Sequence, residues 1–228
     1  MKNNLSDLAY SQIKEMITHG EIPIGQVVSV AHFVRLLNIG RTPITNACQK
    51  LAAEEYIRII PKQGIVVVPI SLIDMRDVYE TRQVVEIFTA EKAFPHIEPS
   101  DILRLEDSVG RQIECRKHGA TYAFLEEYRF FHQIIIKKHR NNILADMYDN
   151  ALGRSMPLDA KIFSNPKHMQ EAIDNHCRQI DCLKAQDKQG FVNAVIDGQV
   201  GLDRFLKSYL NEGLNIANTE SWKTPWRG

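Results

Sequence analysis

The stretch RTPITNACQKL, residues Arg41 to Leu51, decides how the first part of this chain folds. Pro43 suits the first turn of a helix, because it has no backbone N–H to lose there. Apolar residues recur at i, i+3, i+4 and i+7 and form one buried face: Ile44, Ala47, Cys48 and Leu51. The opposite face is polar: Thr45, Asn46, Gln49 and Lys50. This pattern predicts a short helix that is buried on one side and polar to basic on the other.

A second short helix is expected just before it. Ser29 can cap its first turn, and Asn38 with Gly40 would end it. Its apolar residues again have helical spacing: Val30, Phe33, Val34 and Leu37. Two short helices joined by a tight turn are typical of a helix-turn-helix, in which the second helix enters the major groove of DNA.

The next residues predict a β-hairpin. Two β-forming runs, Tyr56–Ile60 and Ile65–Val68, flank the turn Pro61–Gly64. The motif is therefore a winged helix-turn-helix. No Asp or Glu occurs from Ile22 to Ala53, which suits a surface facing phosphates, because charge attraction supplies most non-specific DNA affinity. A winged helix can also serve a protein interface, but this charge pattern favours DNA.

This segment resembles the N-terminal domain of the GntR family of bacterial transcriptional regulators, over Leu8–Pro69. The shared elements are a first helix, the turn Gly20–Gly25, the run Gly40–Pro43 and a glycine-tipped wing. The resemblance implies a mostly α-helical protein with this domain at its N-terminus.

The resemblance also implies DNA contacts by Arg41, at the start of the second helix, and by Gln63 and Gly64 at the wing tip. Two arginines common in the family are missing, because Ala31 and Thr45 stand in their places. These departures leave the operator sequence open.

Length and composition limit the remaining possibilities. A chain of 228 residues with 44% hydrophobic residues can form two domains. Residues 1–70 contain seven Lys and Arg against five Asp and Glu, and the remainder contains 21 against 23. The four cysteines have no zinc-site spacing. Without a signal-peptide core or an apolar run of about 18 residues, a cytoplasmic location is expected.

From residue 71 onward the sequence predicts only helices. They are expected over 72–94, 99–117, 121–138, from 141, over 167–185 and over 187–210, with breaks at Pro157 and at Phe163–Pro166. Helices joined by short loops predict an all-α antiparallel bundle. The predicted organisation is a winged domain over residues 1–70, a helical effector-binding and dimerisation domain over 71–212, and a tail over 213–228.

Two histidines lie on apolar stripes of these helices. His132 follows Tyr128 by four residues, and His176 shares a stripe with Ile173 and Ile180. Two imidazoles directed into a bundle could meet in one ligand cavity. Alternatively they are core histidines, bonded to backbone or to each other, and the residues alone favour this reading.

The helical part resembles the FCD domain of the FadR-like GntR regulators, over about residues 72–210. The segments that carry the resemblance are Tyr79–Glu86, Glu126–His132 with Asn141–Asn142, and His176–Asp187. The resemblance implies a carboxylate effector, often bound by a divalent metal that one Asp and three His hold. Here Tyr128 and Gly198 stand at the aspartate and last histidine positions. We therefore predict no metal or other cofactor, and an organic ligand in a cavity that Gly198 enlarges.

Arg82 is a further ligand candidate. A guanidinium among Val78, Val85 and Phe88 can hold a carboxylate, or it can pair with Glu86 one turn later. Arg154 is a weaker candidate. The predicted ligand site combines residues from several helices: Arg82, Tyr128, His132, His176 and Gly198.

These observations predict a ligand-responsive transcriptional regulator, of repressor type, tuned by a small organic acid. It would act as a homodimer on a roughly palindromic operator. The expected DNA-contacting residues are Arg35, Arg41, Thr42, Thr45, Gln49, Lys50, Lys62, Gln63 and Gly64. An enzyme is disfavoured, because no nucleophile constellation, phosphate-binding loop or carboxylate pair accompanies the histidines. The alternative is a DNA-binding regulator whose helical domain only dimerises around a degenerate pocket.

Overall fold

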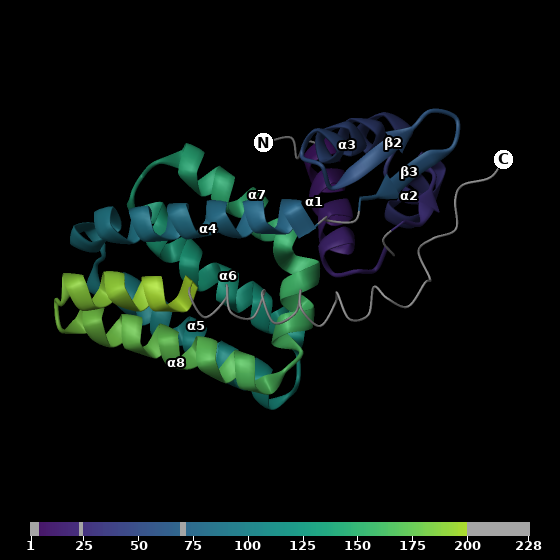
Figure 1. The fold of residues 1–228 in the computed structure, drawn as a ribbon. Helices are drawn as coiled ribbons and strands as arrows, with labels where there is room; N and C mark the ends of the chain where they lie inside the picture. Colours follow the sequence, from purple (N-terminus) through teal and green to yellow (C-terminus); the bar gives the residue numbers. More distant parts are fainter. Residues whose placement is uncertain (1–4, 23–24, 69–71, 200–228) are drawn as a thin grey trace. The chain divides into compact units, whose positions relative to one another are not determined.

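A computed structural model describes residues 5–22, 25–68 and 72–199 of the chain (Figure 1). The chain divides into two compact units. The first contains residues 1–81 and 146–159, and the second contains 82–145 and 160–228. Two helices, α4 (Leu72–Ala93) and α7 (Asn142–Phe163), contribute residues to both units.

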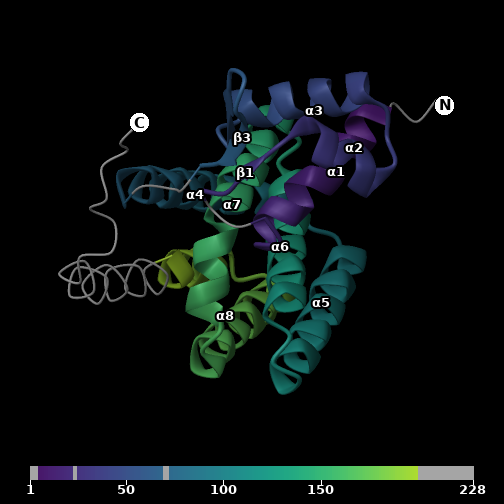
Figure 2. The same cartoon turned by 90° about the vertical axis from the view of Figure 1, so that its right-hand side faces the viewer.

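The first unit begins with a three-helix core and a small sheet. Its elements are α1 (Leu5–Thr18), β1 (Val27–Val28), α2 (Val30–Leu37), α3 (Arg41–Ala53), β2 (Ile57–Ile60) and β3 (Gly64–Val67). The helix α3 packs against α1 and α2 (Figure 2). The predicted apolar face of α3 is buried in the core, with Ile44, Ala47, Cys48 and Leu51 all at most 1% exposed. The winged helix-turn-helix fold is therefore confirmed.

The local signals explain why α2 and α3 stay separate helices. Ser29 Oγ accepts a hydrogen bond from the backbone N–H of His32 at 3.1 Å, which caps α2. Asn38 ends α2 with φ 52°, in the left-handed region that Asn tolerates. The chain can therefore reverse within three residues and begin α3 at Arg41.

The sheet has the order β1-β3-β2, and both pairings are antiparallel. The hairpin of β2 and β3 matches the predicted wing, with Ile60 opposite Gly64. The sequence did not indicate β1, because two residues, Val27 and Val28, are too few to show alternation.

The second unit is entirely helical in the part that the structure describes. It contains the 3-10 turn Phe94–His96, α5 (Pro99–Lys117), α6 (Thr121–Lys138), α8 (Pro166–Lys184) and helical residues 188–199. The helix α5 packs against both α6 and α8 (Figures 1 and 2). The predicted bounds of α5 and α6 are confirmed. The linker at 69–71, the end of the last predicted helix and the tail lie outside the described residues.

One predicted break is wrong. Pro157 lies inside α7, which runs without interruption from Asn142 to Phe163. Proline removes one hydrogen bond from a helix interior and crowds the carbonyl of residue i−4. That residue is Gly153, which has no side chain to add to the crowding.

In the residues that the structure describes, no helix is both long and apolar enough to span a membrane.

Candidate functional site

The exposed face of α3 carries most of the predicted DNA-contacting side chains. Arg41, Thr42 and Gln49 are exposed, and Thr45 is half-buried. The Thr45 hydroxyl donates to the Arg41 carbonyl at 2.9 Å, so part of its hydrogen-bonding capacity is used within the helix. The helix therefore presents an uncharged polar surface that begins with one guanidinium.

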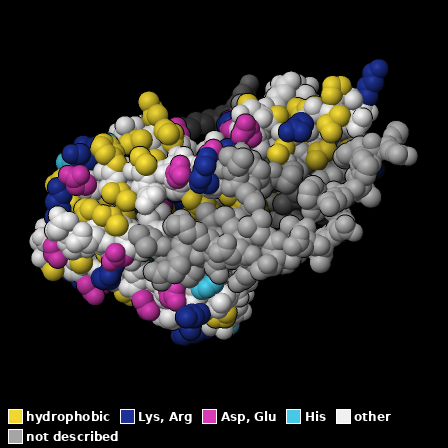
Figure 3. All heavy atoms as spheres, in the orientation of Figure 1, with side chains coloured by type: hydrophobic (Ala, Val, Ile, Leu, Met, Phe, Trp, Pro, Cys, Tyr) yellow, Lys and Arg dark blue, Asp and Glu magenta, His cyan; other side chains and the backbone are white. Residues whose placement is uncertain are grey.

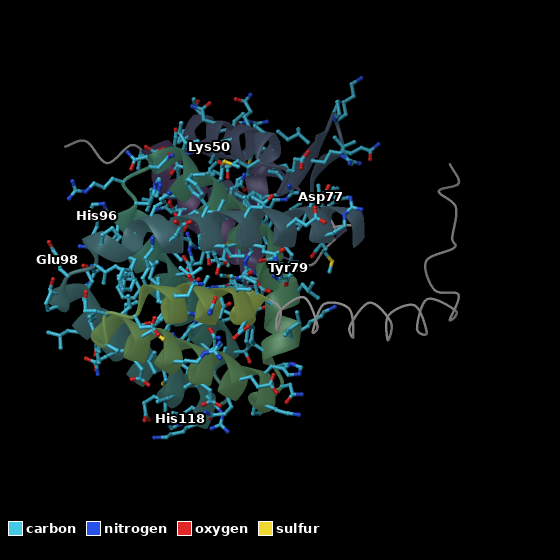
Figure 4. The ribbon with its side chains drawn as sticks, turned by 60° about the vertical axis from the view of Figure 1, so that its left-hand side comes forward. Lys50, Asp77, Tyr79, His96, Glu98 and His118 are labelled. Carbon is cyan, nitrogen blue, oxygen red and sulfur yellow. The ribbon has the colours of Figure 1, made fainter. Side chains whose placement is uncertain are left out.

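Two basic residues flank this surface. Arg35 is exposed at the end of α2. Lys50 (Figure 4) is exposed near the end of α3, where its ammonium lies 4.0 Å from the centre of the Tyr10 ring. A cation–π contact of this kind fixes a lysine without neutralising its charge. Lys50 remains able to attract a phosphate.

The wing tip is formed by Pro61, Lys62 and Gln63, all exposed. Gly64 is half-buried, and a Cβ there would lie 2.7 Å from the backbone oxygen of Val28. Glycine is therefore needed at position 64 because a larger residue would collide with the neighbouring strand β1. The contact of Gly64 with DNA remains a prediction.

Buried polar side chains in the second unit contact one another and form what we call the buried polar cluster. His176 Nδ1 lies 2.9 Å from Gln112 Oε1, and His176 Nε2 lies 3.2 Å from His132 Nε2. His132 Nδ1 lies 3.1 Å from Glu86 Oε2. All four side chains are at most 5% exposed. The structure therefore brings the two predicted histidines together. They pair with each other, as expected if they are core histidines.

The orientation of the Gln112 amide determines which ring nitrogens of the two histidines donate hydrogen bonds and which accept them. The Gln112 amide N–H donates toward Ser108 Oγ, so its oxygen accepts from His176 Nδ1. His176 Nε2 must then accept from His132 Nε2–H. On its other side, His132 Nδ1 faces the Glu86 carboxylate. Burial, followed by the charge of His132, holds the pKa of His176 well below its ordinary value of 6.5.

Aromatic rings enclose the histidine pair. The Phe131 ring stacks on His176 at a centroid distance of 3.8 Å. The Tyr128 ring lies 4.6 Å from His132 and 5.1 Å from His176. Tyr128, at the position of the family's aspartate, therefore contacts both imidazoles through its ring.

Arg82 is fully buried on α4 and pairs with Glu86 at 3.7 Å, the alternative that the sequence left open. Val85 is buried beside it, but Phe88 is 46% exposed and does not share this face, contrary to the prediction. Arg154 belongs to the first unit, where it pairs with Glu55 at 3.1 Å. Arg154 is not part of the buried polar cluster.

Sequence reasoning missed two members of the cluster. Gln112 is fully buried on α5, and Gln199 donates to Glu86 from the helix over 188–199. The signal that could have found Gln112 is its spacing. Ser108 and Gln112 lie one turn apart on the same face of α5 as the apolar Leu105 and Val109.

The role predicted for Gly198 is wrong. A Cβ at Gly198 would lie 2.8 Å from the side-chain oxygen of Asn175, so the space beside it is filled. Asn175 is held there by donating to the Ala194 carbonyl and accepting from Gln179. Gly198 allows α8 and the following helix to approach closely and does not enlarge a cavity.

The residues present do not fit the metal site implied by the family resemblance. Among the described residues, no group of three or more His, Cys, Asp or Glu side chains is placed to hold a metal ion. The two facing imidazole nitrogens lack both a carboxylate at Tyr128 and a third histidine at Gly198. The prediction of a metal-free site stays a prediction.

Two protein-family models and several known proteins match this chain. The family model "Bacterial regulatory proteins, gntR family" matches residues 5–67, and the model "FCD domain" matches residues 77–197. The HTH-type transcriptional regulator McbR of Escherichia coli K12 is 20% identical over 79% of this chain and 82% of its own length. The gluconate operon transcriptional repressor of Bacillus licheniformis is 22% identical over 78% of this chain and 74% of its own length.

Solved structures show the same fold. The structure of E. coli McbR/YncC matches with a TM-score of 0.81 at 19% identity, covering 90% of this chain and 98% of that protein. A GntR regulator from Rhodococcus sp. RHA1 matches with a TM-score of 0.70 at 14% identity, covering 92% of this chain and 97% of that protein.

Proposed function

Because the chain belongs to the gntR family of bacterial regulatory proteins, and is therefore a DNA-binding transcriptional regulator, we propose that it is a ligand-responsive repressor. It binds a roughly palindromic operator as a homodimer, and a small organic acid tunes this binding. Residues 1–70 serve DNA binding, and residues 71–212 serve effector binding and dimerisation.

The exposed face of α3 supports the DNA-binding role most directly. Arg41, Thr45 and Gln49 contact base edges in the major groove, while Arg35, Lys50 and Lys62 contact phosphates. Thr42 joins them at the start of the helix, and the wing tip at Gln63 and Gly64 lies along the minor groove. A single guanidinium among uncharged groups makes base readout depend strongly on Arg41.

An exposed apolar patch supports the homodimer. Val84 is 69% exposed and Phe88 46% exposed on α4, and Ile143 is 72% exposed at the start of α7. Figure 3 shows hydrophobic side chains gathered over these two helices. Exposed apolar groups of this size are typical of a surface that a partner covers. A two-fold pairing of this patch presents two copies of α3 to two half-sites.

The buried polar cluster supports the effector. Burying Arg82, Glu86, His132 and His176 costs folding free energy that apolar side chains would not cost. N–H groups from a guanidinium and imidazoles are the groups that bind a carboxylate. The aromatic rings of Tyr128 and Phe131 exclude water from the same place. The rival proposal, a helical domain that only dimerises, rests on the pairing of the two histidines with each other.

Thermal unfolding with added organic acids separates the two proposals. Gluconate is the first probe, because two relatives are named gluconate operon transcriptional repressors. Effector binding predicts that an acid raises Tm and changes operator affinity, and that H132Q/H176Q abolishes both effects. The exposed H118Q variant on the same unit is the matched control. If no acid in a broad panel of carboxylates and sugar acids raises Tm, the dimerisation-only proposal holds.

A further inference from the structure

A pocket lies on the outer side of the α5–α6 pair, and it is lined by cations. Its volume is about 280 Å³, and its walls carry Arg104, Lys137, Lys138 and Arg140 around the apolar side chains of Phe130 and Ile134. We propose that this pocket binds a small phosphate-bearing molecule, with the phosphate between Lys137 and Arg140.

The charges in this pocket differ in how they are compensated. Lys138 Nζ lies 2.5 Å from Asp101 Oδ2 and 3.3 Å from Glu98 Oε2, and Arg104 lies 3.6 Å from Asp101. These carboxylates fix Lys138 and Arg104 in the wall and cancel part of their charge. None of the ion pairs found within the described residues engages Lys137 or Arg140, and both are exposed. The chain has no net charge overall, so this local excess of positive charge is not a property of the whole surface.

The backbone positions the two uncompensated cations together. Lys137 lies in the last turn of α6, and Arg140 follows the helix in the left-handed conformation, with φ 59°. Arg140 N–H donates to the Lys137 carbonyl at 3.1 Å, which closes the turn between them. An ammonium and a planar guanidinium on the wall of one pocket suit a phosphate, because the guanidinium can donate two parallel hydrogen bonds to its oxygens.

The floor of the pocket suits an organic part of the ligand. Phe130 is half-buried and Ile134 is buried, so together they offer a fixed apolar surface. Arg104 lies 5.5 Å from the centre of the Phe130 ring and holds one side of it. A volume of about 280 Å³ is close to the lower limit for small-ligand pockets. A mononucleotide or a sugar phosphate fits this volume, whereas a nucleic-acid strand does not.

This pocket is separate from the buried polar cluster. Gln133 and Lys137 lie on the pocket side of α6, whereas Tyr128 and His132 face the interior. The proposal therefore does not depend on the organic-acid effector.

Isothermal titration calorimetry on the full chain at low ionic strength tests the proposal. The probes are inorganic phosphate, adenosine monophosphate and adenosine. We expect saturable binding of both phosphate compounds, tighter for the nucleotide, and much weaker binding of adenosine. Loss of two charge-assisted contacts in K137A/R140A should weaken nucleotide binding by about tenfold or more.

The matched control is K167A/K188A, which removes the same charge from exposed positions elsewhere on the second unit. It should bind the nucleotide as the unchanged protein does. The proposal is overturned if neither phosphate probe binds saturably, or if K137A/R140A binds both unchanged. It is also overturned if K137A/R140A loses only DNA affinity, because the pocket would then be a DNA contact.

Discussion

At Gly64 the backbone has φ +137°, and a Cβ would lie 2.7 Å from the Val28 oxygen. Both facts restrict the position to glycine, since side chains disfavour this conformation and the contact is with backbone that cannot rotate away. The glycine therefore lets β1 pair with β3 directly after the turn of the wing. The glycine is evident in the sequence, but the strand that it contacts is not, because β1 is only two residues long.

We expect G64A to lower the free energy of unfolding by about 1–3 kcal/mol. G110A is the matched control, because Gly110 lies in α5 with open space around its Cβ position. Alanine there should leave stability unchanged or raise it by up to about 1 kcal/mol. Urea denaturation measures both. Equal effects of the two substitutions would refute the packing role of Gly64.

Asp101 gives a pH dependence with a defined sign. Burial raises the pKa of its carboxyl, but hydrogen bonds from Lys138 and from the Glu98 backbone N–H, with the charges of Lys138 and Arg104, bring the pKa below its ordinary value. The carboxylate also completes the capping box of α5 with Glu98 (Figure 4). A lowered pKa in the folded state means stabilisation that is present above the unfolded value, near 3.8, and is lost as pH falls through the folded value.

D101N should therefore cost about 1–3 kcal/mol at neutral pH, and this difference from the unchanged protein should shrink as pH falls below about 4. Denaturation at a series of pH values measures it. D107N, at an exposed carboxylate on the same helix, should cost less than about 0.5 kcal/mol. A D101N cost that stays constant down to acid pH would contradict the assignment.

Helices were the elements most accurately predicted, because their signals are local. Ser29, Pro99 and Asn141 mark starts that the structure reproduces. The interior of α7 was not predicted correctly, because Pro157 normally indicates a break. The buried cluster was only half predicted, since Gln112 and Gln199 come from helices distant in sequence and meet the histidines only after packing.

Within the first unit, α7 docks on the winged domain at a glycine. The Tyr56 hydroxyl donates to the Asn150 carbonyl at 3.2 Å, and a Cβ at Gly153 would lie only 2.1 Å from that hydroxyl oxygen. Glu55 and Arg154 form an ion pair at the same contact. A side chain at Gly153 would displace Tyr56 and weaken this docking.

We expect G153A to destabilise the protein by about 1–3 kcal/mol, through overpacking. Y56F alone should cost about 1 kcal/mol for its hydrogen bond. The double variant should be more stable than the sum of the two effects predicts, because removing the hydroxyl relieves most of the clash. Thermal and urea unfolding of the four proteins complete the cycle. Strict additivity would show that Tyr56 and Gly153 are not in contact.

At the scale of the whole molecule, the fold and the family followed from the sequence, whereas the proposed dimer surface did not. Val84 and Phe88 lie one turn apart on α4, whereas Ile143 lies at the start of α7, and their shared exposure is visible only in the folded chain. We expect F88E to convert the dimer to a monomer, because a buried interface charge lacks a partner. L103E, at a leucine of α5 that is even more exposed, should remain dimeric. Sedimentation analysis distinguishes them, and a dimeric F88E would place the interface elsewhere.

We propose that the exposed face of α3, beginning at Arg41, reads DNA sequence while the surrounding cations bind phosphates. This proposal is tested most directly by measuring the affinity of the protein for a duplex selected from a random pool and for a scrambled duplex, over a series of salt concentrations. We expect tighter binding to the selected duplex, a loss of affinity for both duplexes as salt rises, and a larger loss of the preference in R41A than in the exposed control R76A. Equal affinity for the two duplexes, indifferent to salt and to R41A, would contradict it.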